Sequence, residues 1–170
     1  MPSVLLEIQE TVKKYADIMS KVAQVEVEVV DVNLFRVAGT GFFSDHVNED
    51  MSREGYVYRH ILQTGSREII YDPGHEALCS NCPKQNICQE EIEISMPIRL
   101  GEETIGVIGL VGSSREQKER ILENESMYLK LLEQDPRQYS RVLIFESTRT
   151  VQERYYEMTN MVSHVGVSDM

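Results

Sequence analysis

The sequence that decides the fold runs from Ile92 to Gly112 and reads IEISMPIRLGEETIGVIGLVG. Apolar and polar residues alternate in its first half with the period of two that is typical of a β-strand. Gly101-Glu102-Glu103 then supplies the residues of a turn. The second half, from Thr104, is almost wholly apolar, which predicts a central strand covered on both faces. Because Pro97 lacks an N–H group, we expect its strand to lie beside an edge or a bulge.

Patterns upstream of this hairpin predict further elements. Residues 4–22 place apolar side chains three or four apart, which predicts an amphipathic helix. Residues 25–38 alternate apolar and acidic side chains and then resume after a turn, which predicts a second hairpin. Residues 48–63 predict a helix that ends at Gly65, and residues 67–71 predict a short strand.

The hairpin itself and the residues after it complete the fold. Gly106 and Gly109 leave room on the second strand for close packing or for a ligand. Ser113 and Glu116 form a capping-box pattern for a helix that ends near Asp135. Helices at the two chain ends around an antiparallel sheet indicate an α+β domain, and the absence of repeated strand-helix-strand units argues against a doubly wound sheet.

The chain divides into a main domain and a terminal helix. We assign residues 1–135 to one domain whose loop, residues 72–91, contains every cysteine. Residues 136–170 predict a connecting helix that could pack on the first helix or on the same helix of a second copy, so we expect a homodimer.

Charge and hydropathy exclude several classes of function. The formal net charge of -11 should repel a phosphate backbone, so direct nucleic-acid binding is not expected. The chain has neither a basic amphipathic stretch nor a run of about eighteen apolar residues, so the sequence does not suggest a segment that lies on a membrane or crosses it. The first residues lack the layout of a signal peptide, and we expect a cytoplasmic protein.

The loop around the cysteines is the stretch with chemical content. Cys79 and Cys82 have the Cys-x-x-Cys spacing that lets two thiolates point into one small volume, and Cys88 can fold back as a third ligand. Pro83 fixes a turn directly after the pair. The sequence therefore predicts a metal or iron–sulfur site at these three cysteines, with His75 as the nearest candidate for a fourth ligand.

Four alternatives stay open at this site. Cys79, Cys82, Cys88 and His75 would form a closed structural zinc site, whereas three cysteines on an iron–sulfur cluster would leave one iron open to another ligand. Two of the cysteines could instead form a disulfide in air, or all three could be free thiols. His75 follows Pro73-Gly74, where a histidine is more often a solvated turn residue.

No motif predicts catalysis. The chain contains no phosphate-binding Gly-x-x-x-x-Gly-Lys, no Gly-x-Ser-x-Gly and no His-Glu-x-x-His, and its His-Glu and Cys-x-x-Cys pairs lack the spacing of zinc deaminases. We therefore expect a protein that is not an enzyme. A group of aromatic and methionine side chains could line a small-molecule pocket beneath the cysteine loop, although such residues more often fill a core: Phe42, Phe43, Met51, Tyr56 and Tyr58.

The hairpin wording Pro-Ile-x-x-Gly-x-x-x-Ile-Gly-Val-Ile-Gly-Leu, from Pro97 to Leu110, downstream of the cysteine loop, resembles a known family. It is similar to the amino-terminal GAF-like sensory domain of sigma-54-dependent (Fis-type) transcriptional regulators from anaerobic bacteria. The resemblance covers residues 8–132 and is strongest over residues 75–117. Because this wording is common to many sensor domains of the PAS/GAF superfold, it indicates the fold more than the function.

The resemblance implies a sheet flanked by amino- and carboxyl-terminal helices, with a pocket that senses a small molecule or a redox state. In such regulators the sensor is joined to ATPase and DNA-binding modules, so we expect an excised sensor domain whose partners are the downstream modules. A change at the cysteine site would alter loop packing on the hairpin, and the terminal helices would carry that change onward. Alternatively the cysteines are only a structural zinc clasp or free thiols, and the pocket alone binds the signal.

Overall fold

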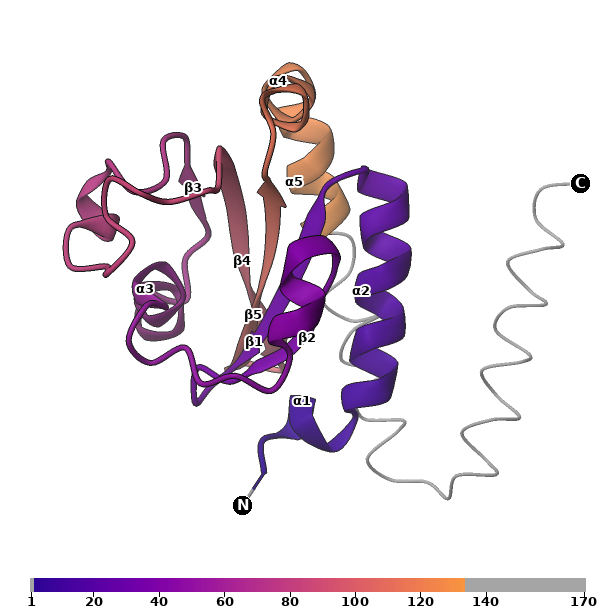
Figure 1. The fold of residues 1–170 in the computed structure, drawn as a ribbon. Coiled ribbons are helices and arrows are strands. Elements are labelled where there is room, and N and C mark those ends of the chain that lie inside the picture. The colour runs from indigo at the N-terminus through magenta and orange to yellow at the C-terminus, as the bar shows by residue number, and fades with distance from the viewer. Residues whose placement is uncertain (1, 134–170) are drawn as a thin grey trace, which may run out of the picture.

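A computed structural model describes residues 2–133, and in this range the chain folds around a five-stranded antiparallel sheet (Figure 1). The strand order is β2-β1-β5-β4-β3. The α+β class is therefore confirmed, and the almost wholly apolar strand β5 is central as predicted. The strands are β1 (Glu26–Asp31), β2 (Arg36–Gly39), β3 (Glu68–Ile70), β4 (Ile92–Leu100) and β5 (Glu103–Gly112).

Helices cover both faces of the sheet. In Figure 1, α2 and α5 lie against one face, whereas α3 and the loop that follows β3 lie over the other. Two short 3-10 helices, η1 and η2, lie within the connections. The bounds are α1 (Val4–Glu7), α2 (Gln9–Ala23), η1 (Gly41–His46), α3 (Tyr56–Thr64), η2 (Ala77–Cys79), α4 (Arg115–Glu123) and α5 (Glu125–Glu133).

The main hydrophobic core fills the space between the sheet and α2 with α5. Each fully buried valine, leucine or isoleucine contributes about 1.5–3 kcal/mol by leaving water. The apolar members of the strand alternation point to this side, as the period of two requires. They include Val25, Val27, Val29, Ile92, Ile94, Met96 and Ile98, packed with Val12, Ala16, Met19, Tyr128 and Leu132.

The other face of the sheet carries both apolar and charged side chains. A second, smaller cluster joins strand residues to α3, with Val30, Leu34, Met51, Tyr58, Ile61 and Val107. The acidic members of the alternation, Glu28 on β1 and Glu93 on β4, are buried on this same side. The face beneath α3 therefore contains buried carboxyl groups, and the functional site is built there.

The pairing of β4 with its two neighbouring strands explains where its proline lies. Pro97 faces Val107 of β5, but β3 pairs with β4 only over Glu93–Ser95. Pro97 therefore lies beyond the end of β3, where its missing N–H leaves no neighbouring strand unpaired. The register also shifts between Ile98 and Arg99. The expectation of an edge or a bulge at this proline is confirmed.

The helix predicted over residues 48–63 begins later, at Tyr56. The preceding residues are held beside β2, where Arg36 donates its backbone N–H to Glu49 O and Met51 donates its N–H to Leu34 O. These hydrogen bonds compete with a helical turn. The helix does end at Gly65, which adopts a φ of 67° as a left-handed cap.

Two further expectations need correction at the chain ends. The amino-terminal helix is divided at Ile8, which separates α1 from α2. The last helix begins one residue later than the capping-box pattern predicted, because the Ser114 hydroxyl accepts the Gln117 N–H at 3.1 Å. A break at Asn124 then separates α4 from α5. The predicted connecting helix of residues 136–170 lies outside the described residues.

None of the helices described within residues 2–133 is long and apolar enough to cross a membrane.

Candidate functional site

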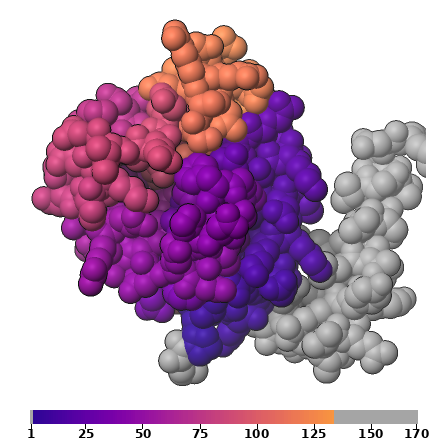
Figure 2. Space-filling model, viewed as in Figure 1, coloured from indigo at the N-terminus to yellow at the C-terminus, as the bar shows by residue number. Residues whose placement is uncertain are grey.

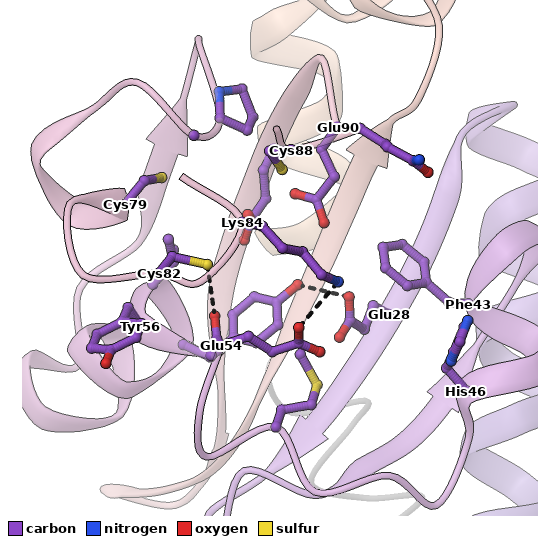
Figure 3. Close-up of a pocket in the computed structure, with 18 of the residues that line it drawn as sticks. Glu28, Phe43, His46, Glu54, Tyr56, Cys79, Cys82, Lys84, Cys88 and Glu90 are labelled. Atoms are coloured by element: carbon purple, nitrogen blue, oxygen red, sulfur yellow. Dashed lines mark hydrogen bonds and ion pairs between the residues drawn. The ribbon is translucent and has the colours of Figure 1, made fainter. Parts of the chain in front are cut away.

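A cavity of about 460 Å³ lies between the second face of the sheet and the cysteine loop (Figure 3). Strands β1 and β4 supply its floor, α3 and the residues before it supply one wall, and the loop covers it. In Figure 2 the loop forms a separate lobe beside the body of the domain. The cavity is lined by charged, aromatic and thiol side chains, among them Glu28, Arg36, Phe42, Phe43, His46, Glu49, Met51, Glu54, Tyr56, Tyr58, Cys79, Cys82, Lys84, Cys88, Glu90 and Glu93.

A buried ion pair forms part of the floor. The Arg36 Nε donates to Glu28 Oε1 at 3.0 Å, and the Tyr58 hydroxyl donates to Glu28 Oε2 at 3.2 Å. Burial raises the pKa of Glu28 although Arg36 opposes the shift, so the guanidinium only partly offsets the loss of water. Both side chains are almost fully buried, so water cannot serve either of them in place of its partner.

The remaining donors of Arg36 point to the cavity rim. Its Nη1 donates to His46 O at 3.0 Å and contacts Glu49 Oε2 at 3.3 Å. The Phe43 ring lies against the guanidinium, 5.4 Å from Cζ to the ring centroid. Arg36 therefore ties β2 to η1 and cannot serve a ligand freely.

A second carboxyl group, that of Glu93, lies on the floor without a cation in contact. The Ser95 hydroxyl donates to Glu93 Oε1. Burial raises the pKa of Glu93 to about 7, with Glu28 adding to the rise. Burial and these two carboxylates also raise the pKa of Tyr58 well above its ordinary value, so its hydroxyl stays a donor. Glu93 is therefore a proton acceptor whose charge changes near neutral pH.

A third carboxyl group comes from Glu90, at the junction of the loop with β4. Its side chain points into the cavity beside Lys84 (Figure 3). Burial and the neighbouring Glu93 raise the pKa of Glu90 well above its ordinary value. No hydrogen bond to this carboxyl group is formed by the residues that the structure describes. The Glu90 carboxyl group thus lacks a hydrogen-bond donor.

The cysteine loop is fastened to the body at a few points. Glu76 accepts the backbone N–H groups of Tyr71 and Asp72 at 2.6 and 2.9 Å, which closes the loop at its base. On the opposite side, Lys84 pairs with Glu54 at 3.1 Å. These contacts are at least partly exposed to solvent, so each contributes little to stability.

The three cysteines predicted as ligands all line the cavity. The Cys82 thiol donates to Glu54 O at 3.8 Å, and Cys79 is buried at the end of η2 (Figure 3). Gly74 adopts a φ of 88°, and an added Cβ would lie 3.0 Å from the Cβ of Cys88. Burial raises the pKa of Cys79, and burial with Glu90 raises the pKa of Cys88 to about 11. In this arrangement the thiols of Cys79 and Cys88 are protonated at neutral pH.

The fourth predicted ligand lies elsewhere. His75 contacts Asp72 through Nδ1 at 3.1 Å and is not among the residues that line the cavity. Within residues 2–133, no three side chains of the cysteine, histidine, aspartate and glutamate types come together so that they could hold a metal ion. A metal or iron–sulfur centre at Cys79, Cys82 and Cys88 stays a prediction, and it would require the loop to close further.

Five pocket residues were anticipated from the sequence, and the cavity contains all of them: Phe42, Phe43, Met51, Tyr56 and Tyr58. Sequence reasoning missed the carboxyl groups of Glu28, Glu90 and Glu93. The alternation around Glu28 and Glu93 was a usable signal, because it places acidic side chains on one face of two strands. The alternation alone does not show which element covers that face of the sheet.

Comparison with known proteins connects the chain to one regulator. The chain is 35% identical over 122 residues to UacR of Escherichia coli (strain K12), provisionally described as a uric acid sigma-54-dependent transcriptional regulator. This match covers 72% of the chain but only 21% of the relative. The chain thus corresponds to about a fifth of that regulator. No protein-family profile matches the sequence.

Solved structures show the same fold at low sequence identity. The GAF domain of the Acinetobacter phosphoenolpyruvate-protein phosphotransferase superposes with a TM-score of 0.55 at 10% identity, covering 89% of each chain. The A. aeolicus nlh2 GAF domain gives 0.50 at 19% identity, covering 73% of this chain and 81% of its own. The type II free methionine-R-sulfoxide reductase of Thermoplasma acidophilum gives 0.50 at 17%, covering 71% and 88%. The chain therefore has the GAF fold, and over 122 residues its sequence is related to that of a sigma-54-dependent transcriptional regulator.

Proposed function

We propose that this chain is the signal-sensing domain of a transcriptional regulator and that its signal is a small molecule bound in the cavity beneath the cysteine loop. The observation that carries the proposal is the cavity itself. Its volume of about 460 Å³ falls in the range of small-molecule sites, and it combines aromatic walls with a few convergent polar groups. The relationship to a sigma-54-dependent regulator supports the regulatory role.

The connectivity gives a route by which binding could reach other modules. The loop enters β4 directly, through Cys88, Glu90 and Glu93, and β4 pairs along its whole length with β5. The opposite face of these strands packs against α2 and α5. A ligand that pulls the loop onto the sheet would therefore act on strands that also hold the flanking helices, and joined modules would receive the change from there.

Uric acid is the first ligand to test, because the related regulator is named for it. Titration of the full 170-residue chain should raise its melting temperature, since a ligand at about 100 times its Kd stabilises a protein by about 2.7 kcal/mol. A tryptophan at Val57, which lines the cavity, should abolish the shift. A tryptophan at the exposed Val32, which is not among the lining residues, should leave the shift unchanged.

The sensing role would be refuted by the absence of any bound small molecule. The chain purified from cells would then release no ligand detectable by mass spectrometry, and neither uric acid nor related heterocycles would shift its melting temperature. Circular dichroism of the Val57→Trp variant separates a blocked cavity from a lost fold.

A metal or iron–sulfur centre at Cys79, Cys82 and Cys88 is a second candidate for the sensing chemistry. It is favoured by one observation, that all three thiols line the same cavity. Anaerobic purification with metal and sulfide analysis should compare the native chain with a variant carrying serine at these three positions. Iron with acid-labile sulfide would make it a cluster sensor, zinc alone would make the loop a clasp, and no metal would leave the cavity as the sole sensing element.

We further propose that the chain is not an enzyme. A reductase with this fold shows that the fold also occurs in enzymes, so the absence of catalysis rests on the lack of a catalytic motif in this sequence. The downstream modules, a homodimer, a cytoplasmic location and the absence of direct nucleic-acid binding likewise rest on the sequence and on the related regulator.

A further inference from the structure

The cavity holds more carboxyl groups than donors to satisfy them. Its acidic lining residues are Glu28, Glu49, Glu54, Glu90 and Glu93, and its basic ones are Arg36, Lys84 and His46. Ion pairs account for the first three acids: Glu28 and Glu49 contact Arg36, and Glu54 contacts Lys84. Glu90 and Glu93 make no ion pair within the part of the chain that the structure describes. Glu90 and Glu93 are therefore the two carboxyl groups of the cavity that lack a cationic partner.

The neutral donors of the cavity do not fill this deficit. The Tyr58 hydroxyl has one proton and can donate it either to Glu28 Oε2, at 3.2 Å, or to Glu93, so it satisfies only one of these two carboxyl groups at a time. The Ser95 hydroxyl donates to Oε1 of Glu93. The Cys82 thiol donates to the Glu54 carbonyl oxygen. One carboxyl group of the pair Glu28 and Glu93 therefore lacks the Tyr58 donor at any moment, and the half-buried carboxyl group of Glu90 has no donor among the residues that the structure describes.

Open acceptors of this kind are costly unless something else supplies the donors. A buried polar group without a hydrogen-bond partner destabilises the protein, and more so when it is charged. Water can fill an empty cavity, but a ligand with positioned N–H groups supplies the missing donors, and its hydrogen bonds become charge-assisted, about twice as strong as neutral ones, once these carboxyl groups are ionised. A ligand bearing carboxylate or phosphate groups would meet like charges instead.

We propose that the ligand of this cavity is a planar nitrogen heterocycle that donates ring N–H groups to Glu90 and Glu93. This inference rests on the proposed function, that the cavity binds a small-molecule signal. Aromatic side chains are available to pack on a flat ring, because Phe43 and Tyr56 both line the cavity. Oxopurines belong to this class, since neutral xanthine carries several ring N–H groups and uric acid, which loses one ring proton to become a monoanion at neutral pH, keeps the others.

The test compares ligands that share a ring system but differ in whether their ring nitrogens carry hydrogen or methyl groups. Uric acid and xanthine are titrated against the full chain by calorimetry, beside tetramethyluric acid and caffeine, in which methyl groups replace the ring N–H donors. A site built around such donors rejects analogues that lack them, so we expect at least ~100-fold weaker binding of the methylated compounds. This comparison uses the native protein and needs no variant to fold.

Matched variants then assign the acceptors. Glu90→Gln and Glu93→Gln should each weaken binding at least ~10-fold, because a bidentate or charge-assisted contact is lost. Glu91→Gln serves as the control, since Glu91 is exposed and does not line the cavity although it neighbours Glu90; its effect should stay below ~2-fold. Melting curves of all three variants establish that each is folded.

The outcomes separate this inference from the sensing role. If the methylated compounds bind as tightly as uric acid and xanthine, or if the glutamine variants bind normally, the cavity is a ligand site but N–H recognition is refuted. If no heterocycle of either kind binds and none is released from purified protein, the proposed function fails and this inference with it.

Discussion

Arg36 forms an ion pair with Glu28, and both side chains are almost fully buried, so water cannot take the place of the guanidinium. Removing one partner of a buried ion pair leaves an uncompensated charge, which typically costs about 3–5 kcal/mol. We therefore expect Arg36→Ala to lower the free energy of unfolding by about this amount, measured by urea denaturation at pH 8.

A matched control comes from an exposed arginine. Arg115 pairs with Glu119 on the surface of α4, where both side chains are largely exposed. Arg115→Ala should change the free energy of unfolding by less than about 0.5 kcal/mol. A loss at Arg36 as small as that at Arg115 would show that Glu28 is neutral in the folded chain, because only a charged partner requires compensation.

Glu93 makes stability depend on pH near neutrality. Its pKa is raised from 4.5 to about 7 by burial and by Glu28, so the folded chain holds a proton that the unfolded chain has already released. Stability from this group is therefore complete below about pH 4.5 and is lost as the pH rises to about 7, by up to ~1.4 kcal/mol per pH unit. Glu93→Gln should remove this slope and should be more stable than the native chain at pH 8.

The groups that face Glu93 define the control for this measurement. Glu28 of β1, Tyr58 of α3, Ser95 of β4 and the cavity carboxyl group of Glu90 surround it. Because Glu93 raises the pKa of Glu90, the difference between variant and native curves reports the titration of Glu93 together with its effect on Glu90. Urea titrations at pH 5, 6, 7 and 8 provide these curves. Parallel curves for the two proteins would show that Glu93 titrates with an ordinary pKa.

Among the secondary-structure elements, the strands could be predicted because the alternation of side chains along a strand is visible in a short stretch of sequence. The apolar run from Thr104 to Gly112 identified the central strand, and Pro97 identified the place where β4 loses a neighbour. Gly106 and Gly109 were expected to leave room for packing or for a ligand, and both allow close packing. An added Cβ at Gly106 would meet Leu5 of α1, whereas at Gly109 it would meet the Tyr58 hydroxyl above the cavity floor.

The cavity could be predicted only in part, because its contacts join residues far apart in the chain. Tyr58 reaches Glu28 across 30 residues, and no local pattern encodes that pairing. The spacing of Cys79 and Cys82 placed two thiols in one loop, but a spacing does not define whether the loop closes around a metal. The aromatic lining was anticipated from residue type, whereas the carboxyl groups were found only once α3 was seen to cover their face of the sheet.

The close approach of α1 to β5 can be tested at Gly106. A Cβ there would lie 2.3 Å from Leu5 Cδ1 and 2.6 Å from Val30 O, which belongs to the hydrogen-bonded backbone of β1. Because that oxygen cannot move without disturbing the sheet, Gly106→Ala should cost about 1–3 kcal/mol of stability in urea unfolding. Glu103→Ala, at an exposed position of the same strand, should cost less than about 0.5 kcal/mol. Equal stabilities for both variants would mean that α1 does not pack at this position.

At the scale of the whole molecule, the dominant physical property is the acidic charge. The chain has 28 acidic and 17 basic residues, and its net charge of -11 at pH 7 opposes compaction through self-repulsion. Several exposed ion pairs are local, such as Lys13 with Glu10 and Arg120 with Glu116, and each offsets little of this repulsion. Salt should therefore stabilise the fold, because screening acts on all the repelling charges together.

Raising the ionic strength from ~0.01 M to ~0.15 M shortens the Debye length from ~30 Å to ~8 Å, so repulsion across the domain is screened while contacts near 3 Å largely persist. We expect the melting temperature at pH 8 to rise by several degrees over this range in sodium chloride. The control is the same experiment near the isoelectric point of about 4.8, where the net charge vanishes and the salt effect should vanish with it. A melting temperature that falls with salt at pH 8 would instead mean that specific ion pairs, with the buried pair of Arg36 and Glu28 foremost, outweigh the net charge in holding the domain together.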